Sequence, residues 1–200
     1  RIVIKGLNTG KQIEKLMNKV CNKKGIYDIN DIKMPLVIPS VDLCKGDVIC
    51  FTSCKFRNTI SDNTIFRNDI EIGKAVRASC SYPVVFEPCS YKNIKLVDGG
   101  VRENVPWKEL KALGADKVIN IIFEDKENTV CNKNLIEVAG RSIGLLCREL
   151  SNYELNGADL TLKITSNKVG LLDMKKIDEL YELGYRQTKE NIKKIKKLIY

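Results

Sequence analysis

The stretch Lys95-Leu-Val-Asp-Gly-Gly-Val-Arg-Glu-Asn-Val-Pro106 places a carboxylate directly after a short apolar run and directly before two glycines. The run at residues 94–97 predicts a short strand that ends at Asp98. Asp98 can be a turn residue, because an Asp-Gly pair is common where a strand reverses. It can also be a catalytic carboxylate at a rigid strand end, where Gly99 and Gly100 leave room for a substrate. The surrounding sequence is needed to choose between these two interpretations.

Strands and helices alternate on both sides of this stretch. Apolar and β-branched runs predict strands at residues 34–41, 48–52, 94–97, 117–123 and 158–165, and turn residues at 42–47 join the first two. Helical spacing predicts helices at residues 11–20, 72–79, 106–113, 135–150, 174–183 and 190–199, with a break between the last two around Gly184. The run 117–123 has the pattern of a parallel strand that is covered on both faces. The alternation predicts an α/β sandwich with a largely parallel sheet.

The composition is that of a soluble globular chain, with 44% apolar and 30% charged residues in a length of 200 that suits one domain. No apolar run approaches the roughly 18 residues that a membrane span needs. The formal charge of +9 comes from 34 Lys and Arg against 25 Asp and Glu. Because the lysines are mixed with acidic residues and are not interleaved with aromatic ones, we expect a solvated surface and no nucleic-acid partner. Weak contact with an anionic membrane surface is the alternative.

The cysteines and the absence of histidine narrow the chemistry further. None of the eight cysteines forms a Cys-x-x-Cys pair, so the sequence predicts no metal site and no cofactor. Cys44, Cys50 and Cys54 are the only close group, and we expect them to be buried on the predicted hairpin. Free thiols favour a reducing compartment, which predicts a cytoplasmic protein that is at most peripheral at the membrane. Without histidine, a hydrolase built on this chain needs a carboxylate as its base.

A series of motifs occurs in a characteristic order along the chain. Ala75-Val-Arg-Ala-Ser-Cys-Ser-Tyr-Pro-Val-Val-Phe-Glu-Pro88 precedes the stretch quoted first, and Leu113-Gly-Ala-Asp-Lys-Val-Ile119 follows it. Pro35-Leu-Val-Ile-Pro-Ser-Val-Asp-Leu43 comes earlier, and Ala158-Asp159 and Leu183-Gly-Tyr185 come later. In this order and spacing the chain resembles the patatin-like phospholipases, most closely the bacterial members, over nearly its whole length.

This resemblance implies a three-layer α/β/α sandwich with a mostly parallel central sheet, and a lipid acyl hydrolase of the phospholipase A type. The substrate is then a lipid acyl ester, and catalysis uses a serine–aspartate dyad without histidine. The base of the dyad falls on Asp98, with Gly99 and Gly100 as supporting residues. An aspartate with its ordinary pKa of ~3.9 is a weak base, so burial at the strand end would strengthen it. The alternative is a catalytically silent module that keeps the fold and binds lipid.

The serine of such a dyad is not evident in these residues. In the family it lies in a Gly-x-Ser-x-Gly elbow between a strand and a helix, after a glycine-rich oxyanion loop and before the aspartate. Gly140-Arg-Ser-Ile-Gly144 satisfies the pattern, but it follows Asp98 and lies inside the predicted helix 135–150. We therefore interpret Ser142 as a packing residue. Ser81 is followed by Tyr82-Pro83, which does not form an elbow either.

We expect residues 1–200 to form a single domain that is the C-terminal portion of a patatin-like domain. Asp98 and part of the acyl pocket then lie in this chain. The serine and the oxyanion loop lie on an N-terminal segment of the same protein that these residues do not include. Gly6-Leu-Asn-Thr-Gly10 matches the loop that follows the elbow region in the family.

The closing segment, residues 189–200, contains five lysines among apolar residues. Ile192, Ile195 and Ile199 share one stripe of a helix with this sequence. The favoured interpretation is that the stripe packs on the sheet and the lysines are solvated. The alternative is a basic amphipathic helix that lies on anionic lipid.

Overall fold

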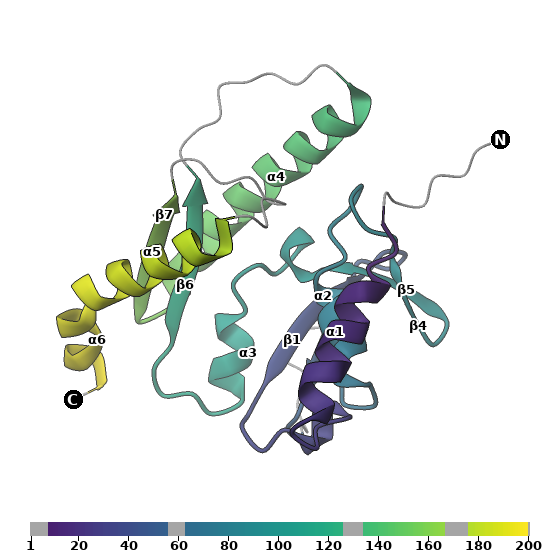
Figure 1. Cartoon of the computed structure of the whole chain (residues 1–200), viewed down its shortest axis with the longest axis horizontal. Helices are drawn as coiled ribbons and strands as arrows, with labels where there is room; N and C mark the ends of the chain where they lie inside the picture. The colour runs from purple at the N-terminus through teal and green to yellow at the C-terminus, as the bar shows by residue number, and fades with distance from the viewer. Residues whose placement is uncertain (1–7, 56–62, 126–133, 167–175, 200) are drawn as a thin grey trace.

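The computed structural model describes residues 8–55, 63–125, 134–166 and 176–199 (Figure 1). Its α-helices are α1 (Lys11–Asn22), α2 (Ile72–Ser79), α3 (Trp107–Ala112), α4 (Leu135–Glu154), α5 (Ile177–Glu190) and α6 (Ile192–Ile199). Its short 3-10 helices are η1 (Ile29–Asp31), η2 (Gly99–Val101) and η3 (Leu155–Gly157). Its strands are β1 (Val37–Asp42), β2 (Val48–Thr52), β3 (Thr64–Arg67), β4 (Cys89–Tyr91), β5 (Ile94–Asp98), β6 (Ile119–Asp125) and β7 (Leu160–Ser166).

Five strands form one mixed sheet in the order β3-β2-β1-β5-β4. β1 runs antiparallel to β2 and to β5, β4 runs antiparallel to β5, and β2 and β3 are parallel. The α/β class is therefore confirmed, but the prediction of a mostly parallel central sheet is wrong. Two of the antiparallel pairs, β1–β2 and β4–β5, are hairpins, because strands joined by a few residues pair in this way. The turn predicted at 42–47 already makes β1 and β2 such a hairpin. The third pair, β1–β5, joins strands that are far apart in the chain.

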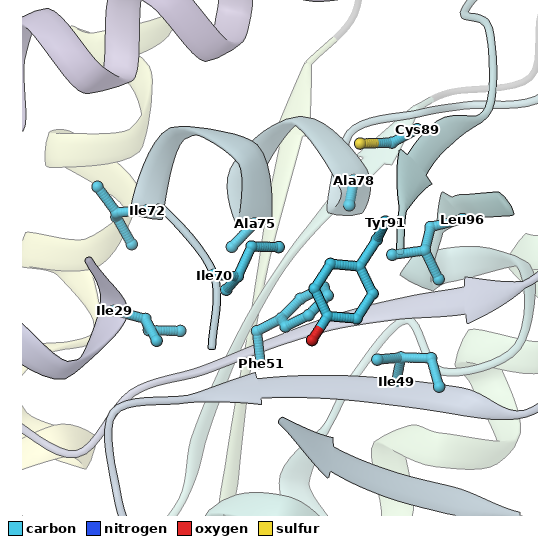
Figure 2. Packing of buried hydrophobic residues seen from close by; sticks show 10 residues of the cluster. All are labelled: Ile29, Ile49, Phe51, Ile70, Ile72, Ala75, Ala78, Cys89, Tyr91 and Leu96. Carbon is cyan, nitrogen blue, oxygen red and sulfur yellow. The ribbon is translucent and has the colours of Figure 1, made fainter. Parts of the chain in front are cut away.

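The hydrophobic core that includes the five-stranded sheet lies between this sheet and α2. α2 packs on β1 and β5, and α1 packs on α2. Figure 2 shows the side chains that fill the core, which are Ile29, Ile49, Phe51, Ile70, Ile72, Ala75, Ala78, Cys89, Tyr91 and Leu96. The small side chains of Ala75 and Ala78 let α2 approach the sheet closely. Gly73 does the same toward α1, because a Cβ there would lie 2.3 Å from Asn18 Oδ1.

β6 and β7 form a separate parallel pair, and α4 lies between them in the chain. Figure 1 shows α5 beside this pair. Gln187 of α5 holds the end of β7, because its side chain bonds both the N–H and the carbonyl of Thr165 at 3.1 Å. The parallel direction predicted for 117–123 is confirmed, but the predicted coverage of both faces is wrong. Ile121 is 59% exposed and Phe123 79% exposed, since no described element packs over them.

Local predictions agree with the structure more closely than the pairing predictions do. β2 and α2 have the predicted bounds, 48–52 and 72–79. The predicted break at Gly184 is wrong, because α5 continues through this glycine, which costs only about 1 kcal/mol in a helix interior. α5 ends instead at Glu190, and the N–H of the next residue, Asn191, donates to the Thr188 carbonyl at 3.0 Å. Residues 174–175 of the predicted helix and residues 6–7 of the predicted loop lie outside the described residues.

The grouped cysteines behave differently from one another. Cys50 is fully buried on β2, Cys54 is partly exposed and Cys44 is exposed in the turn that follows β1. The expected burial therefore holds for Cys50 and is wrong for Cys44. Within the described ranges, no group of three or more His, Cys, Asp or Glu side chains is placed to hold a metal ion. No helix of these ranges is long and apolar enough to cross a membrane.

Candidate active site

Asp98 is the last residue of β5 and is held by backbone contacts on both sides. Its Cα pairs with that of Ser40 on β1, and its N–H donates to the Ser81 carbonyl at 3.0 Å. Its Oδ1 accepts from the Gly100 N–H at 2.7 Å, which caps η2. The carboxylate therefore stands at the end of a strand that is fixed in the sheet, where a functional side chain is positioned precisely.

The two glycines after Asp98 serve packing. A Cβ on Gly99 would lie 2.7 Å from the Pro39 carbonyl oxygen, so the glycine lets η2 rest on β1. A Cβ on Gly100 would lie 2.8 Å from Asn104 Oδ1 and 3.1 Å from Asp98 Oδ1. Gly99 thus leaves room for the backbone of β1, while Gly100 keeps the side of the carboxylate free and donates to it.

We predict that Gly99→Ala lowers stability by about 1–3 kcal/mol, because the new methyl group meets backbone that cannot rotate away. For a chain of this size that corresponds to a Tm decrease of about 2–12 °C in thermal unfolding. Gly140→Ala is the matched control, since a Cβ at Gly140 on α4 has no atom within 4 Å. The control should keep or raise the Tm. An unchanged Tm in Gly99→Ala would show that η2 does not need this close approach.

Burial strengthens the Asp98 carboxylate as a base. Burial raises its pKa, and the hydrogen bond from Gly100 lowers it in part. The negative charge of Asp98 also contributes to the raised pKa values of Cys80, Tyr82 and Cys147, after burial of each group. Cys80 and Tyr82 flank Ser81, whose carbonyl accepts from the Asp98 N–H, so these two residues lie near the end of β5. A carboxylate with a raised pKa accepts a proton more readily, which is the property that a general base needs.

Tyr82 connects this region to α4. Its hydroxyl donates to the Gly140 carbonyl at 3.2 Å, and a Cβ on Gly144 would lie 3.5 Å from the same hydroxyl oxygen. The two glycines of the Gly-x-Ser-x-Gly match thus form the surface of α4 on which Tyr82 rests. Ser142 lies inside α4, and its hydroxyl donates to the Val138 carbonyl at 2.9 Å. The helical interpretation of this match is confirmed, and the match is not a strand–helix elbow.

Ser40 and Ser81 both lie next to Asp98 through the backbone, but neither hydroxyl bonds its carboxylate. The Ser40 hydroxyl donates to the Ile49 carbonyl at 3.1 Å. Ser81 is buried, and its Oγ donates to the Arg77 carbonyl at 2.8 Å. In the part of the chain that the structure describes, no serine hydroxyl bonds the Asp98 carboxylate. The site therefore holds a positioned carboxylate that no serine hydroxyl of the described residues bonds.

Sequence reasoning missed a cluster of carboxylates next to this site. Glu109 of α3 is only 1% exposed, and its Oε2 has no hydrogen-bond partner among the described residues. Burial and then the charge of Glu109 raise the pKa of Glu103 to about 8. Glu154 Oε2 accepts from the N–H groups of Asn104 at 3.1 Å and Val105 at 2.9 Å. No pattern in the sequence distinguishes Glu103, Glu109 or Glu154 from other polar residues of the chain.

Because the pKa of Glu103 is raised on folding, the cluster should make stability depend on pH. Between the ordinary value of 4.5 and about 8, the folded protein holds a proton that the unfolded chain has released. Stability should therefore fall as the pH rises through this range. We predict that Glu103→Gln reduces the fall in Tm between pH 6 and pH 8.5, as measured by thermal unfolding. Glu149→Gln, at an exposed position of α4, should keep the wild-type dependence. Equal slopes in all three proteins would contradict the raised pKa.

Comparison with known proteins adds two findings. A family model described as patatin-like phospholipase matches residues 4–111, a range that includes Asp98 and both glycines. The uncharacterized protein YqhO of Bacillus subtilis (strain 168) is 30% identical over 203 residues, which cover 92% of this chain. The chain spans 66% of the length of that relative.

Proposed function

The chain belongs to the patatin-like phospholipase family, and from this premise we propose that it supplies the base and part of the acyl pocket of a serine lipid hydrolase. The observation that carries the proposal is Asp98, a half-buried carboxylate with a raised pKa at a fixed strand end. The substrate class is a lipid acyl ester, and the reaction is carboxylic ester hydrolysis of the phospholipase A type. Membership of the family supports lipid hydrolysis, while the dyad and the role of Asp98 are our proposals.

In the proposed reaction, Asp98 takes the hydroxyl proton of a serine as the serine oxygen attacks the ester carbonyl carbon. The bond between the serine oxygen and this carbon forms, and the carbonyl electrons move to its oxygen. When the intermediate collapses, the bond to the alcohol breaks and Asp98 returns the proton to the leaving alcohol. Water then attacks the acyl-serine with Asp98 again as the base, which releases the fatty acid and restores the serine.

We further propose that the serine comes from an N-terminal segment of the same protein, and that this segment packs on an exposed apolar face. One stripe of α4 turns apolar side chains to solvent, and its members are Leu135, Val138, Leu145, Leu146 and Tyr153. A helix of a globular protein normally buries such a stripe. On β6, Ile121 and Phe123 are exposed as well, although parallel strands are generally covered on both faces. The chain spans 66% of the length of its relative, so about a third of that relative has no counterpart in these residues.

The proposed activity is tested on the complete protein, meaning this chain together with the segment that precedes it. We expect it to release free fatty acid and lysophospholipid from phospholipid vesicles, as detected by mass spectrometry. If the complete protein binds the vesicles but releases neither product, the hydrolase proposal is wrong. It would favour the alternative, a catalytically silent lipid-binding module.

Peripheral contact with anionic membranes is a separate proposal, and α6 is its candidate surface. Ile192 and Ile199 are 42% and 60% exposed, so the ends of the isoleucine stripe do not pack on a sheet as the sequence led us to expect. Each lysine near anionic lipid adds about 1 kcal/mol of attraction.

We predict salt-sensitive sedimentation of the protein with anionic vesicles and none with neutral vesicles. Replacing four lysines of α6 by Gln should weaken this binding at least ~10-fold. The four are Lys193, Lys194, Lys196 and Lys197. Equal or absent binding to both vesicle types would leave α6 without this role.

A further inference from the structure

A cavity of about 710 Å³ opens where α1, α2 and the β4–β5 hairpin meet. Basic side chains from these elements line it, and they are Lys11, Lys15, Lys74, Arg77 and Lys95. Its acidic lining residues are Glu14 and Glu87. Five basic and two acidic groups leave the wall with a net charge of +3. A concave wall with one sign of charge concentrates ions of the opposite sign.

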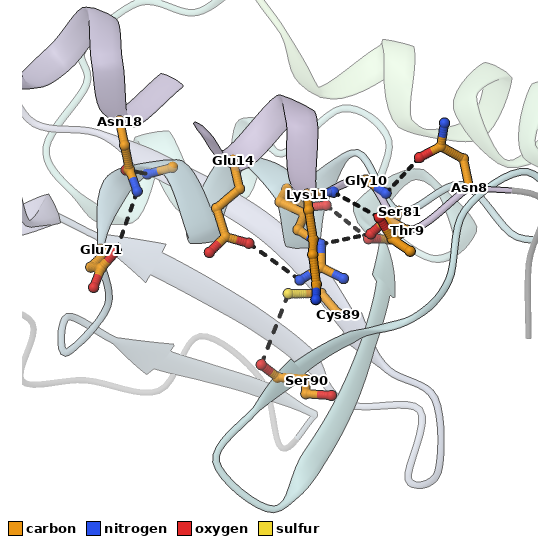
Figure 3. A network of polar contacts seen from close by, with 12 residues as sticks. Asn8, Thr9, Gly10, Lys11, Glu14, Asn18, Glu71, Ser81, Cys89 and Ser90 are labelled. Atoms are coloured by element: carbon orange, nitrogen blue, oxygen red, sulfur yellow. Dashed lines mark hydrogen bonds and ion pairs between the residues drawn. The ribbon is translucent and has the colours of Figure 1, made fainter. Parts of the chain in front are cut away.

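Arg77 is the fixed part of this wall, and its side chain is only 11% exposed. Its Nε donates to the Thr9 carbonyl at 3.1 Å, and its Nη1 donates to the Glu14 carboxylate at 3.2 Å. Figure 3 shows this network between α1 and α2. Arg77 and Glu14 therefore form a neutral pair, and the net positive charge of the wall comes from its four lysines, opposed by Glu87.

The four lysines of the wall form no salt bridge within the described residues. Lys95 instead donates to Ser90 Oγ at 2.6 Å, which holds its ammonium group at the wall. Cys89 lies between the lining residues Pro88 and Ser90. Charged side chains of α2 and of β5 both act on its thiol. Burial raises the pKa of the Cys89 thiol, and the charge of Glu14 adds to this increase, while the positive charges of Arg77, Lys74 and Lys95 oppose it.

The N-terminus of α1 adds to the positive potential. The helix begins at Lys11, which lines the cavity, and Gly10 before it provides no side-chain cap. The helix dipole favours an anion at this end, although the Lys11 and Ile13 N–H groups already bond Thr9 Oγ1 at 3.4 Å and the Gly10 carbonyl at 3.0 Å. Lysines, an arginine and a helix N-terminus therefore meet around one concave space.

We propose that this cavity binds the phosphate group of a small phosphorylated ligand. The volume exceeds that of a bare phosphate and lies within the roughly 300–1,000 Å³ of small-molecule sites, so the organic part of the ligand also fits. The site involves none of the residues around Asp98 and does not depend on the proposed hydrolase activity. The ligand is either a phospholipid headgroup or a soluble phosphate ester, and both present the same phosphate chemistry.

The test measures binding of glycerol 3-phosphate by isothermal titration calorimetry at low and high salt. We expect one site whose affinity falls with salt. The double variant Lys74→Gln/Lys95→Gln should lose affinity at least ~10-fold, because each lysine is expected to give the phosphate a charge-assisted hydrogen bond. The matched control is Lys193→Gln/Lys194→Gln on α6, which changes the net charge equally and should bind as the wild type does. Equal loss in both variants would mean diffuse attraction to the basic surface and would overturn the proposal.

Vesicles distinguish the two sources of phosphate. Phosphatidylglycerol and phosphatidylcholine vesicles are compared in a background with the four α6 lysines replaced by Gln. Vesicle binding that the Lys74→Gln/Lys95→Gln change abolishes would identify a lipid headgroup. Binding of glycerol 3-phosphate without such vesicle binding would identify a soluble ester. If neither probe depends on Lys74 and Lys95, the cavity does not bind phosphate.

Discussion

Asp98→Asn in the complete protein should lower the rate of ester hydrolysis by ~10²–10⁴-fold, because the amide keeps the size of the side chain but cannot accept the serine proton. The Gly100 N–H can still donate to the amide oxygen, so the cap of η2 is kept. The loss should appear in kcat, since Asp98 acts on the proton in the transition state and makes no contact that would hold the ground state.

The control is Asp116→Asn, at an exposed position before β6. It should keep the wild-type rate. Thermal unfolding of both variants checks that the fold is intact, and we expect Tm values close to that of the wild type. If Asp98→Asn hydrolyses esters at the wild-type rate, Asp98 is only the turn residue that caps η2.

Ester hydrolysis should also be lost when the serine-bearing segment is absent. We predict that residues 1–200 alone do not hydrolyse short-chain acyl esters, because no described serine meets the Asp98 carboxylate. Loss of the nucleophile from a serine hydrolase costs on the order of 10⁶ in kcat. The assay compares purified chain with the complete protein at equal concentration. Clear turnover by the chain that Ser142→Ala abolishes would contradict both the segment proposal and the assignment of Ser142 to packing.

The bounds of helices and strands with a clear local pattern could be predicted from the sequence. Which strands pair with one another could not. β2 and α2 have bounded apolar patterns, so their limits were read correctly. β4 has only three residues, and β3 pairs with β2 across a long connection, so neither shows enough local pattern to be recognised. The mixed sheet follows from such pairings, which arise from tertiary contacts and not from residue propensity.

At the candidate site, too, the local feature was predicted from the sequence and the tertiary contacts were not. A carboxylate at the end of β5 was predicted from the apolar run and the glycines that flank it. Its anchor on the Ser81 carbonyl joins segments 17 residues apart, and the sequence shows no sign of it. Glu109 is polar and lies in an amphipathic pattern, where exposure is the expected outcome. Its burial beside Glu103 and Glu154 depends on how α3 and α4 pack, so only the structure reveals the cluster.

The most direct test of the proposed dyad maps the reactive serine. The complete protein is treated with a fluorophosphonate, which reacts with activated serines, and the modified peptide is identified by mass spectrometry. We predict one modified serine in the segment before Arg1, none within residues 1–200, and strongly reduced labelling in Asp98→Asn. A label on Ser142, on Ser81 or on any other serine of this chain would contradict a nucleophile supplied from outside these residues.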